Sequence, residues 1–384
     1  MHIPFNKPYL TGNEIKYIQQ VIDDGKFSGN ADFSKRCAEW LEKTTGCKKA
    51  ILTPSGTAAL EMMMLLADIG PGDEVIMPSF TFSSTANAVV LRGGVPVFVD
   101  IRPDTLNLDE SLIESAITNR TRAILSVHYA GIGCEMDSIM AIANKHNLLV
   151  LEDAAQCILS YYNDRHLGTI GQMGALSFHE TKNIHCGEGG ALLINDPALV
   201  ERSEIVMEKG TDRSKFFRGE IDKYTWVDVG SSYLMNEITA AFLWAQMEEA
   251  ENIVAKRLTA WNEYYLALKH IENNAYLRLP AIPEKCGKHN GHIFYVLFGN
   301  GKKRNTIMKY LNLYGVNAVF HYIPLHNAAA SLGFCRPGRV SVDLPVTIDI
   351  SLRLLRLPIW PEVPVAKVVK QLEQAFKEYG GNIH

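Results

Sequence analysis

Between about residues 31 and 250, short apolar runs of strand length alternate with longer stretches of helical pattern. The apolar runs are Leu-rich or β-branched on successive residues, and they lie at 74–78, 95–100, 122–128 and 147–153. Such runs are typical of strands that are buried on both faces of a parallel sheet. The helical stretches between them lie at 57–68, 84–92, 109–117 and 136–146. This alternation predicts a mostly parallel α/β sheet with right-handed crossovers.

The rest of the chain has a different organisation. Residues 1–30 are rich in Pro, Gly and Asn and predict an arm that contains one helix. Residues 236–272 have continuous helical spacing, which suits a long helix between two domains. Beyond about residue 275, a strand is expected at 292–298 and helices near 302–314 and 363–379. We therefore expect a large α/β domain with an N-terminal arm over 1–250 and a smaller C-terminal α+β domain over 251–384.

Charge and hydropathy exclude several functions. The 384 residues include 38 basic and 42 acidic ones, and no long basic run is present, so nothing predicts nucleic-acid binding. No run of about 18 apolar residues occurs, so no membrane-spanning helix is expected. Any anionic substrate must be held by a local site.

The spacing of the cysteines and histidines indicates neither a redox motif nor a metal site. The seven cysteines, the last of which is Cys335, form no CxxC pair and are expected to be free thiols in a reducing cytoplasm. The first ten residues contain no apolar signal segment, which also favours a cytoplasmic protein. No His pair has metal-ligand spacing, so no metal is expected, and no GxSxG elbow of a hydrolase is present.

An acidic residue ends one of the predicted strands. Asp153 is the last residue of the run at 147–153, and ligands of parallel sheets sit at the carboxyl ends of strands. A carboxylate there can hold a proton on a heterocyclic nitrogen. Gln156 lies three residues on, where a helical turn brings it to the same side. For Asp153 alone, a helix cap or a structural acid is the alternative interpretation.

A lysine occupies a polar turn between two apolar runs. Lys182 follows the predicted strand that contains Ser177 and precedes the glycines of 187–190. This setting suits a lysine that is partly withdrawn from water, and desolvation lowers an amine's pKa and makes it a better nucleophile. A solvated surface lysine remains the alternative.

Two further segments follow strands. Gly56 and Thr57 open a strongly helical run, and the free N–H groups and dipole of such a helix start attract anions. Phe82 lies just beyond the run at 74–78, where an aromatic ring can stack on a planar ligand. A helix cap without ligand and ordinary core packing are the respective alternatives.

Together, and in this order, these motifs resemble the DegT/DnrJ/EryC1/StrS family of sugar aminotransferases, over essentially the whole chain. The resemblance implies the type I fold of enzymes that depend on pyridoxal 5′-phosphate (PLP), and an obligate homodimer. It implies that Lys182 is the catalytic residue to which PLP attaches, and that Asp153 pairs with the ring nitrogen. The other cofactor contacts it implies are Gly56, Thr57, Phe82, Gln156, Ser177 and, as a hydroxyl donor to the partner subunit's cofactor, Ser232.

The resemblance also implies the substrates, which are a nucleotide-linked 4-keto-6-deoxy sugar and L-glutamate as the amino donor. Candidate substrate contacts are His179, Arg213, Arg218, Lys223, Tyr322 and His326. A solvated mixed-charge loop is the alternative for the three cations, and a structural histidine for His326. Amination at C3, the glucose epimer at C4, and a PLP-binding protein without turnover remain alternative functions.

Overall fold

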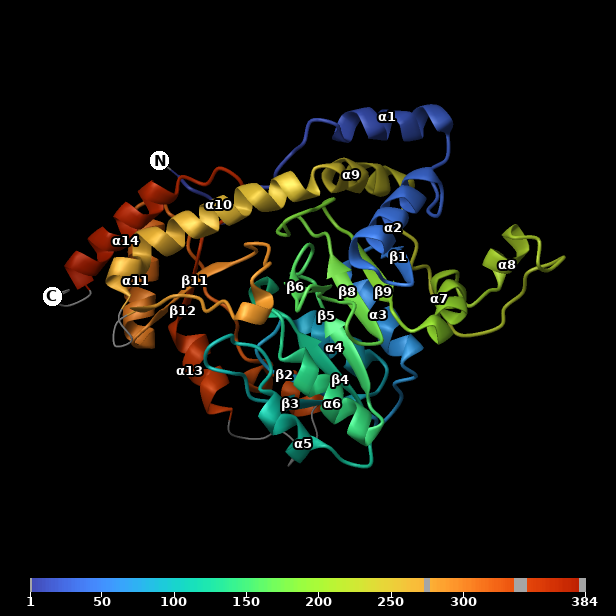
Figure 1. Ribbon diagram of the computed structural model, residues 1–384, viewed down its shortest axis with the longest axis horizontal. Coiled ribbons are helices and arrows are strands. Elements are labelled where there is room, and N and C mark those ends of the chain that lie inside the picture. Colours follow the sequence, from blue (N-terminus) through green and yellow to red (C-terminus); the bar gives the residue numbers. More distant parts are fainter. Residues whose placement is uncertain (1, 273–276, 335–343, 380–384) are drawn as a thin grey trace.

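The computed structural model describes residues 2–272, 277–334 and 344–379. At its centre lies a seven-stranded sheet of order β1-β9-β8-β5-β4-β2-β3 (Figure 1). Strand β9 runs antiparallel to β1 and β8, and the other paired strands are parallel. The strands are β1 Lys49–Thr53, β2 Glu74–Pro78, β3 Val95–Val99, β4 Thr121–Val127, β5 Leu149–Asp153, β8 Met173–Ser177 and β9 Gly190–Ile194. The predicted α/β class is confirmed.

Helices cover both faces of this sheet, so successive strand residues enter different cores. Ile76 packs in one core with helices α2, α6 and α9, whereas Val75 and Met77 pack in the other with α3, α4 and α7. This two-sided burial is why the strand runs lack polar alternation. The helices of this part are α1 Glu14–Asp24, α2 Asp32–Thr45, α3 Gly56–Leu66, α4 Ser83–Leu91, α5 Ile113–Ala116, α6 Met136–His146, α7 Val200–Met207, α8 Arg213–Phe217 and α9 Glu237–Glu248.

Two helix predictions differ from the structure. The helix expected at 109–117 is a 3₁₀ turn, Glu110–Leu112, followed by the single turn α5, because Ile117 adopts an extended conformation that leads into β4. The single helix expected at 236–272 is two helices, α9 and α10 Ala250–Leu268. They meet at Glu249, whose φ of −105° and ψ of 12° interrupt the helix without disturbing the apolar spacing.

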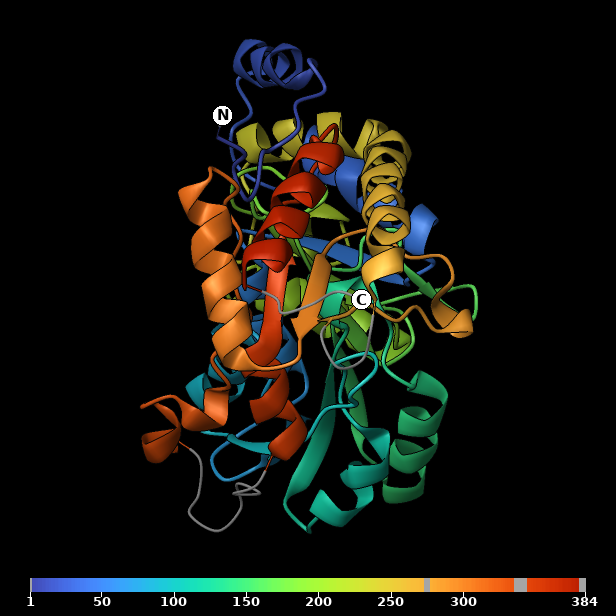
Figure 2. The ribbon, with the colours of Figure 1, turned by 90° about the vertical axis from the view of Figure 1, so that its left-hand side faces the viewer.

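A second sheet lies at the other end of the molecule. It contains β10 Leu277–Arg278, β11 Phe294–Phe298 and β12 Leu354–Leu357, in the order β10-β11-β12. Figure 2 shows α10, α11 Gly301–Leu313 and α14 Val365–Tyr379 beside this sheet. Trp261, Phe294 and Phe376 belong to their shared core. The remaining elements are β6 Tyr161–Tyr162, β7 Arg165–His166, α12 Ser331–Phe334 and α13 Pro345–Arg353. The domain boundary at 250 falls where α10 begins and stays a prediction.

Residues 3–9, which we call the N-terminal strap, connect the two parts. The Ile3 N–H donates to the Gly315 carbonyl at 2.7 Å, and the Trp360 indole donates to the Pro4 carbonyl at 3.1 Å. Further on, the Asn6 amide donates to the Glu180 carbonyl at 3.0 Å. The strap is thereby fixed both to the segments that follow α11 and β12 and to the turn that carries Lys182.

Six cysteines in the described residues carry free thiols. Cys335 lies outside the described residues. Within those residues no helix is long and apolar enough to cross a membrane, and no group of three or more His, Cys, Asp or Glu side chains is arranged to bind a metal ion.

Candidate active site

A cavity of about 430 Å³ lies at the carboxyl ends of β4, β5 and β8, where the small sheet meets the large one. Nine of the predicted site residues line it, namely Gly56, Thr57, Phe82, Asp153, Gln156, Ser177, His179, Lys182 and Tyr322. They come from segments up to 266 residues apart, counted from Gly56 to Tyr322. The cavity therefore gathers the motifs that the sequence places at separate strand ends.

Lys182 is held in a tight connection between β8 and β9. The backbone N–H of Lys182 donates to the His179 carbonyl at 2.8 Å. The backbone N–H of Phe178 donates to the Gly189 carbonyl at 2.8 Å and closes the loop at its base. Burial lowers the pKa of Lys182 to about 8, the carboxylate of Asp153 opposes that shift, and the guanidinium of Arg356 adds to it. The lysine is therefore a far better nucleophile near neutral pH than a solvated one.

Asp153 ends β5 with both carboxylate oxygens bonded. Thr85 Oγ1 donates to Oδ2 at 2.7 Å, and the Ala155 N–H donates to Oδ1 at 3.2 Å. The Thr85 side chain is buried and lies 2.8 Å from the Thr81 hydroxyl. These bonds fix the carboxylate in one orientation, with its charge acting on Lys182 across the cavity.

Gln156 and Tyr322 meet across the cavity. Gln156 Oε1 accepts the Ala130 N–H at 2.6 Å, which leaves its amide nitrogen to donate to the Tyr322 hydroxyl at 3.3 Å. The Tyr322 ring stacks on His321 with centroids 3.9 Å apart. Gln156 thus presents an N–H donor to the cavity, as a bond to a cofactor oxygen requires.

The start of α3 forms the third wall. Ser55 caps the helix by accepting the Ala58 N–H at 3.0 Å, and the first-turn N–H groups that follow have no partner within the helix. A Cβ on Gly56 would lie 2.8 Å from the Ser177 Cβ, so only glycine permits this approach of helix and strand. With the hydroxyls of Ser177 and Thr57 beside it, the corner suits a phosphate.

Phe82 and His179 stand at the cavity wall. Phe82 is 62% exposed, which does not fit the core-packing alternative. His179 accepts the Thr181 N–H at Nδ1, 3.2 Å away, and its Nε2 faces Glu188 at 3.6 Å. Both side chains are available to a ligand.

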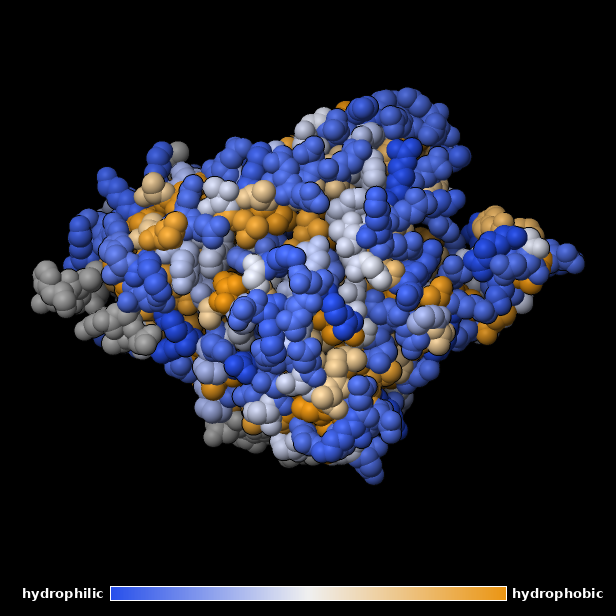
Figure 3. All heavy atoms as spheres, viewed as in Figure 1, coloured by the Kyte–Doolittle hydropathy of each residue, from blue (hydrophilic) through white to orange (hydrophobic). Residues whose placement is uncertain are grey.

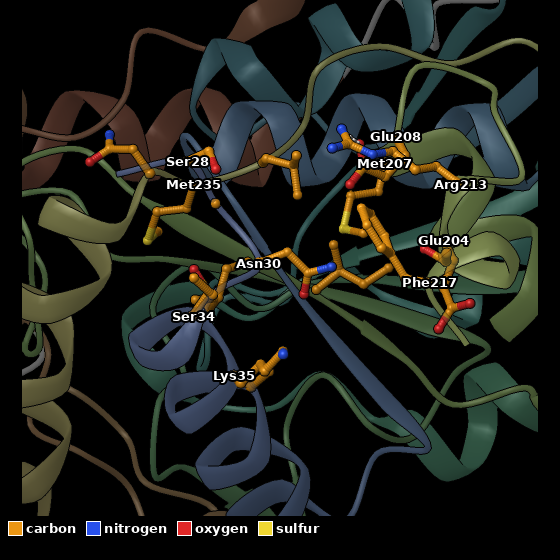
Figure 4. Close-up of a pocket in the computed structure, with 18 of the residues that line it drawn as sticks. Ser28, Asn30, Ser34, Lys35, Glu204, Met207, Glu208, Arg213, Phe217 and Met235 are labelled. Atoms are coloured by element: carbon orange, nitrogen blue, oxygen red, sulfur yellow. Dashed lines mark ion pairs between the residues drawn. The ribbon is translucent and has the colours of Figure 1, made fainter. Parts of the chain in front are cut away.

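Three predicted residues lie in a different cavity, of about 1080 Å³. Arg213, Arg218 and Ser232 line it beyond the edge strand β1, and Figure 4 shows Arg213 beside Glu208. The two arginines are already paired with acids, Arg213 with Glu208 at 3.8 Å and Arg218 with Glu204 at 2.7 Å. Their role as substrate contacts stays a prediction.

Two other predicted residues line neither cavity. His326 Nδ1 lies 2.6 Å from the Ser79 hydroxyl, and its backbone N–H donates to the same oxygen at 3.0 Å. Lys223 lies in the exposed loop after α8. Both assignments stay predictions.

Sequence reasoning missed Arg356 and Thr85, which also line the cavity. Arg356 had one signal, a charged residue inside the otherwise apolar run of 354–357. Thr85 had none, because a threonine near a helix start usually acts as a cap.

A family model for the DegT/DnrJ/EryC1/StrS aminotransferases matches residues 8–382. The chain belongs to this family. The spore coat polysaccharide biosynthesis protein SpsC of Bacillus subtilis (strain 168) is 33% identical over 373 residues, which cover 94% of this chain and 93% of that protein. This aminotransferase therefore transfers an amino group from a donor molecule to a sugar. The family resemblance seen in the sequence is confirmed.

Solved structures of aminotransferases share the fold of this chain. Helicobacter pylori PseC, an aminotransferase involved in the biosynthesis of pseudoaminic acid, superposes with a TM-score of 0.89 at 25% identity and covers 99% of this chain and 100% of its own. S. venezuelae DesV, solved in complex with a ketimine intermediate, has a TM-score of 0.87 at 28% identity, with both chains covered completely. The fold is that of the PLP-dependent aminotransferases, and the cofactor is PLP.

The residues of the cavity fit this cofactor. An amine of lowered pKa suits its aldehyde, the fixed carboxylate of Asp153 suits its ring nitrogen, and the corner at Gly56 suits its phosphate. When bound, PLP supplies the electron sink that stabilises a carbanion next to the amino group.

The lowered pKa of Lys182 gives the first prediction. The neutral amine is the attacking form, so the rate at which PLP attaches to the apoprotein should rise with pH and level off above about pH 8. At pH 7 about a tenth of the amine is neutral, roughly 300-fold more than for a lysine with the ordinary pKa of 10.5. Stopped-flow absorbance across pH 6–11 measures the midpoint, and a midpoint above pH 10 would contradict the buried setting of Lys182.

Proposed function

We propose that this aminotransferase moves the amino group of L-glutamate to C4 of dTDP-4-keto-6-deoxy-D-glucose. The product is dTDP-4-amino-4,6-dideoxygalactose. The observation that carries the transamination is the cavity in which Lys182, of lowered pKa, faces the fixed carboxylate of Asp153.

The sugar assignment is supported by sequence. The chain resembles the bacterial dTDP-4-amino-4,6-dideoxygalactose transaminases in stretches that include GDEVIMPSFTFSSTANA, RPDTLNLDE, VHYAG, EMDSIMA, SFHETKN, RSKFFRGEIDKYTW, GSSYLMNE and VFHYIPLH. Several of these, including SFHETKN and VFHYIPLH, line or border the cavity. The names of SpsC and PseC, which concern the biosynthesis of spore coat polysaccharide and of pseudoaminic acid, support a sugar substrate.

The proposed reaction assigns a role to each wall. Lys182 would hold the cofactor and, as a free amine, would take the proton from the donor's α-carbon. The same amine would return a proton to C4 of the sugar in the second half of the cycle. Asp153 keeps the ring nitrogen protonated, Gln156 donates to the ring oxygen, and Gly56, Thr57 and Ser177 hold the phosphate. Phe82 stacks on the ring, and His179 and Tyr322 contact the sugar.

Proton NMR of the product tests the sugar assignment. The reaction contains purified protein, PLP, glutamate and dTDP-4-keto-6-deoxyglucose. We expect small couplings at H4, which mean an axial amine and the galactose product. Large couplings would mean the glucose epimer. An enzyme that aminates C3 would give no amino sugar from this substrate, but would give a new signal at H3 when the isomeric 3-keto sugar nucleotide replaces it. Either result would replace the proposed product and leave the aminotransferase assignment intact.

We also propose a homodimer, supported by the segment that follows α7. Figures 1 and 3 show α8 and its loop standing away from the body of the molecule with hydrophobic residues on their surface. Phe217 is 65% exposed and Trp226 76% exposed. Apolar patches of this kind mark interfaces. A second copy would cover them and would explain why Arg213, Arg218 and Ser232 lie away from Lys182, since they would serve the partner's site.

Sedimentation measures the mass of the protein in solution and thereby tests the dimer. The wild-type protein should sediment at about twice the 42.8 kDa of one chain. Trp226→Asp should dissociate it, because a buried charge would oppose association. Leu266→Asp is the matched control, since Leu266 is 75% exposed on α10, away from α8 and its loop. A monomeric and active wild-type protein would refute the dimer.

A further inference from the structure

A histidine in the segment that leads into β11 shares the cavity wall with Lys182. His292 lines the cavity and is only 4% exposed. Its backbone carbonyl accepts a hydrogen bond from the buried Arg257 guanidinium at 2.8 Å, and its backbone N–H donates to Asn290 Oδ1 at 3.0 Å. The backbone of His292 is therefore held on both sides, and its ring has a fixed place at the cavity.

Side-chain bonds also determine which ring nitrogen of His292 carries the proton. Nδ1 lies 2.7 Å from Asn183 Oδ1, and the amide nitrogen of Asn183 donates to the Asn290 carbonyl at 2.8 Å. Because the amide nitrogen of Asn183 is used on that carbonyl, the amide oxygen is the atom that faces the imidazole. An amide oxygen can only accept, so Nδ1 carries the proton of the neutral ring and Nε2 carries a lone pair.

The surroundings keep the ring of His292 neutral. Burial lowers its pKa well below the ordinary value, and the charge of Lys182 is the strongest of the charges that lower it further. The other charges that act on the ring in this direction come from Arg257 on α10, Arg356 on β12 and His321. Within the described residues, Nδ1 is the one ring nitrogen that is hydrogen-bonded, so Nε2 is an acceptor without a donor.

The other three histidines that line the described cavity have both ring nitrogens engaged. His321 contacts the Arg356 guanidinium through Nε2, and its Nδ1 lies 3.4 Å from the Tyr129 hydroxyl. His128 pairs with a buried glutamate at 2.9 Å through Nε2 and accepts a backbone N–H at Nδ1. His179 accepts a backbone N–H at Nδ1 and faces an acid through Nε2. The open acceptor is therefore specific to His292.

We propose that Nε2 of His292 accepts a hydrogen bond from the side-chain amine of Lys182 and positions that amine whenever it is free. This proposal rests on the role of Lys182 in the proposed function. Asn183, which binds the imidazole, follows Lys182 directly in the chain, so the lysine and the ring are anchored together. A long lysine side chain has many rotamers, and an acceptor on the wall directs its amine at the carbon from which it takes the proton.

Two substitutions separate the two ends of the ring. Asparagine has the reach of Nδ1, so His292→Asn keeps the bond to Asn183 and loses the acceptor in the cavity. Glutamine has the reach of Nε2, so His292→Gln keeps an acceptor in the cavity and loses the bond to Asn183. We expect His292→Asn to slow the glutamate half-reaction of the PLP-loaded protein about 10- to 100-fold, and His292→Gln to retain most of the rate. A ring that only supports the wall would give the reverse order.

The pH dependence of PLP attachment to the apoprotein gives a readout that does not depend on turnover. An acceptor at the amine favours the charged form of Lys182, so its loss in His292→Asn should move the midpoint about one pH unit below 8. The other groups that act on Lys182, namely Asp153, Cys157 and Arg356, are unchanged in this variant. A wall that had merely loosened would admit water to the amine and move the midpoint upward.

Nitrogen-15 NMR of the histidine-labelled apoprotein reads the ring directly. His292 should show a protonated Nδ1 and an unprotonated Nε2 between about pH 6 and 9, and the Nε2 signal should move as Lys182 titrates near pH 8. Lys182→Ala should abolish that movement. The control variant is His289→Gln, which should change neither the rate nor the midpoint. His289 lies three residues from His292, accepts the Gly291 N–H at 3.3 Å and lies outside the cavity.

Each readout can overturn the proposal. A protonated Nε2, or an Nε2 signal that does not respond to Lys182, would do so, and so would a midpoint of His292→Asn that stays in place or rises. A wild-type rate in His292→Asn would also overturn it. A wild-type protein that does not react with glutamate would refute the donor assignment, while the midpoint and the spectrum would still decide the role of His292. Multiple turnover by Lys182→Ala would refute the proposed function and this proposal together.

Discussion

Lys182→Ala should lower turnover by about 10⁵-fold or more, because one amine serves as nucleophile, base and acid at different steps. No other amine is available to replace it in the described cavity walls, where the remaining cation is the guanidinium of Arg356. The measurement is steady-state formation of the amino sugar from glutamate. The variant should still bind PLP through Asp153 and the start of α3, but borohydride should no longer fix the cofactor to the chain.

An added small amine provides the control for this variant. Methylamine supplies a base without the tether, so it should restore a small part of the proton transfer. Rescue of this kind would show that the cavity is intact. Multiple turnover by Lys182→Ala without an added amine would remove Lys182 from its proposed role.

Asp153→Asn should slow the glutamate half-reaction by about 10²- to 10⁴-fold. Asparagine has the shape of the carboxylate and can still accept from Thr85, but it has no charge to hold a proton on the ring nitrogen. Breaking a buried charge pair by removing one partner costs about 3–5 kcal/mol, which corresponds to that range. Single-turnover absorbance with saturating glutamate measures the rate.

A remote carboxylate is the matched control for Asp153. Asp137 is 63% exposed on the side chain and pairs with Lys285 at 3.5 Å, so Asp137→Asn should leave the half-reaction unchanged. The half-reaction rate of Thr85→Val should lie between the rates of Asp153→Asn and Asp137→Asn. In this variant Asp153 keeps its charge but loses one of the two hydrogen bonds that orient it. A rate within tenfold of wild type for Asp153→Asn would mean that the ring nitrogen is not held by this residue.

Local patterns were sufficient to predict β2, β3, β4, β5 and β8 of the large sheet, whereas β1 at Lys49–Thr53 was not among the predicted strands. Each apolar run is buried on both faces, so its boundaries are marked by polar residues, and β2 at Glu74–Pro78 and α6 at Met136–His146 agree with the predicted ranges. The interruption at Glu249 was not predictable in this way. One residue leaves the helical conformation while the apolar spacing continues, and only the packing of α9 and α10 in different cores reveals the break.

The site was predictable where chemistry is concentrated in short motifs. Asp153, Lys182 and Gly56 each stand at a strand end or helix start, and the order of strands in the sheet brings them together. Arg356 and Phe5 were not predictable, because they reach the cavity from the small sheet and the N-terminal strap. The ion pairs of Arg213 and Arg218 could not be predicted either, since a sequence shows which residues are charged but not which acids pair with which arginines.

The N-terminal strap has a consequence for how the protein is made. Ile3 leaves the ribosome early, but its hydrogen-bond partners Gly315 and Asn317 are synthesised roughly 300 residues later, which takes on the order of 15–60 s at about 5–20 residues per second. The large sheet can fold during this interval, whereas the wall formed by Phe5 and Arg356 cannot. We expect nascent chains halted before residue 315 to contain a folded sheet with an open cavity, so that full enclosure of the lysine is among the last events of biosynthesis.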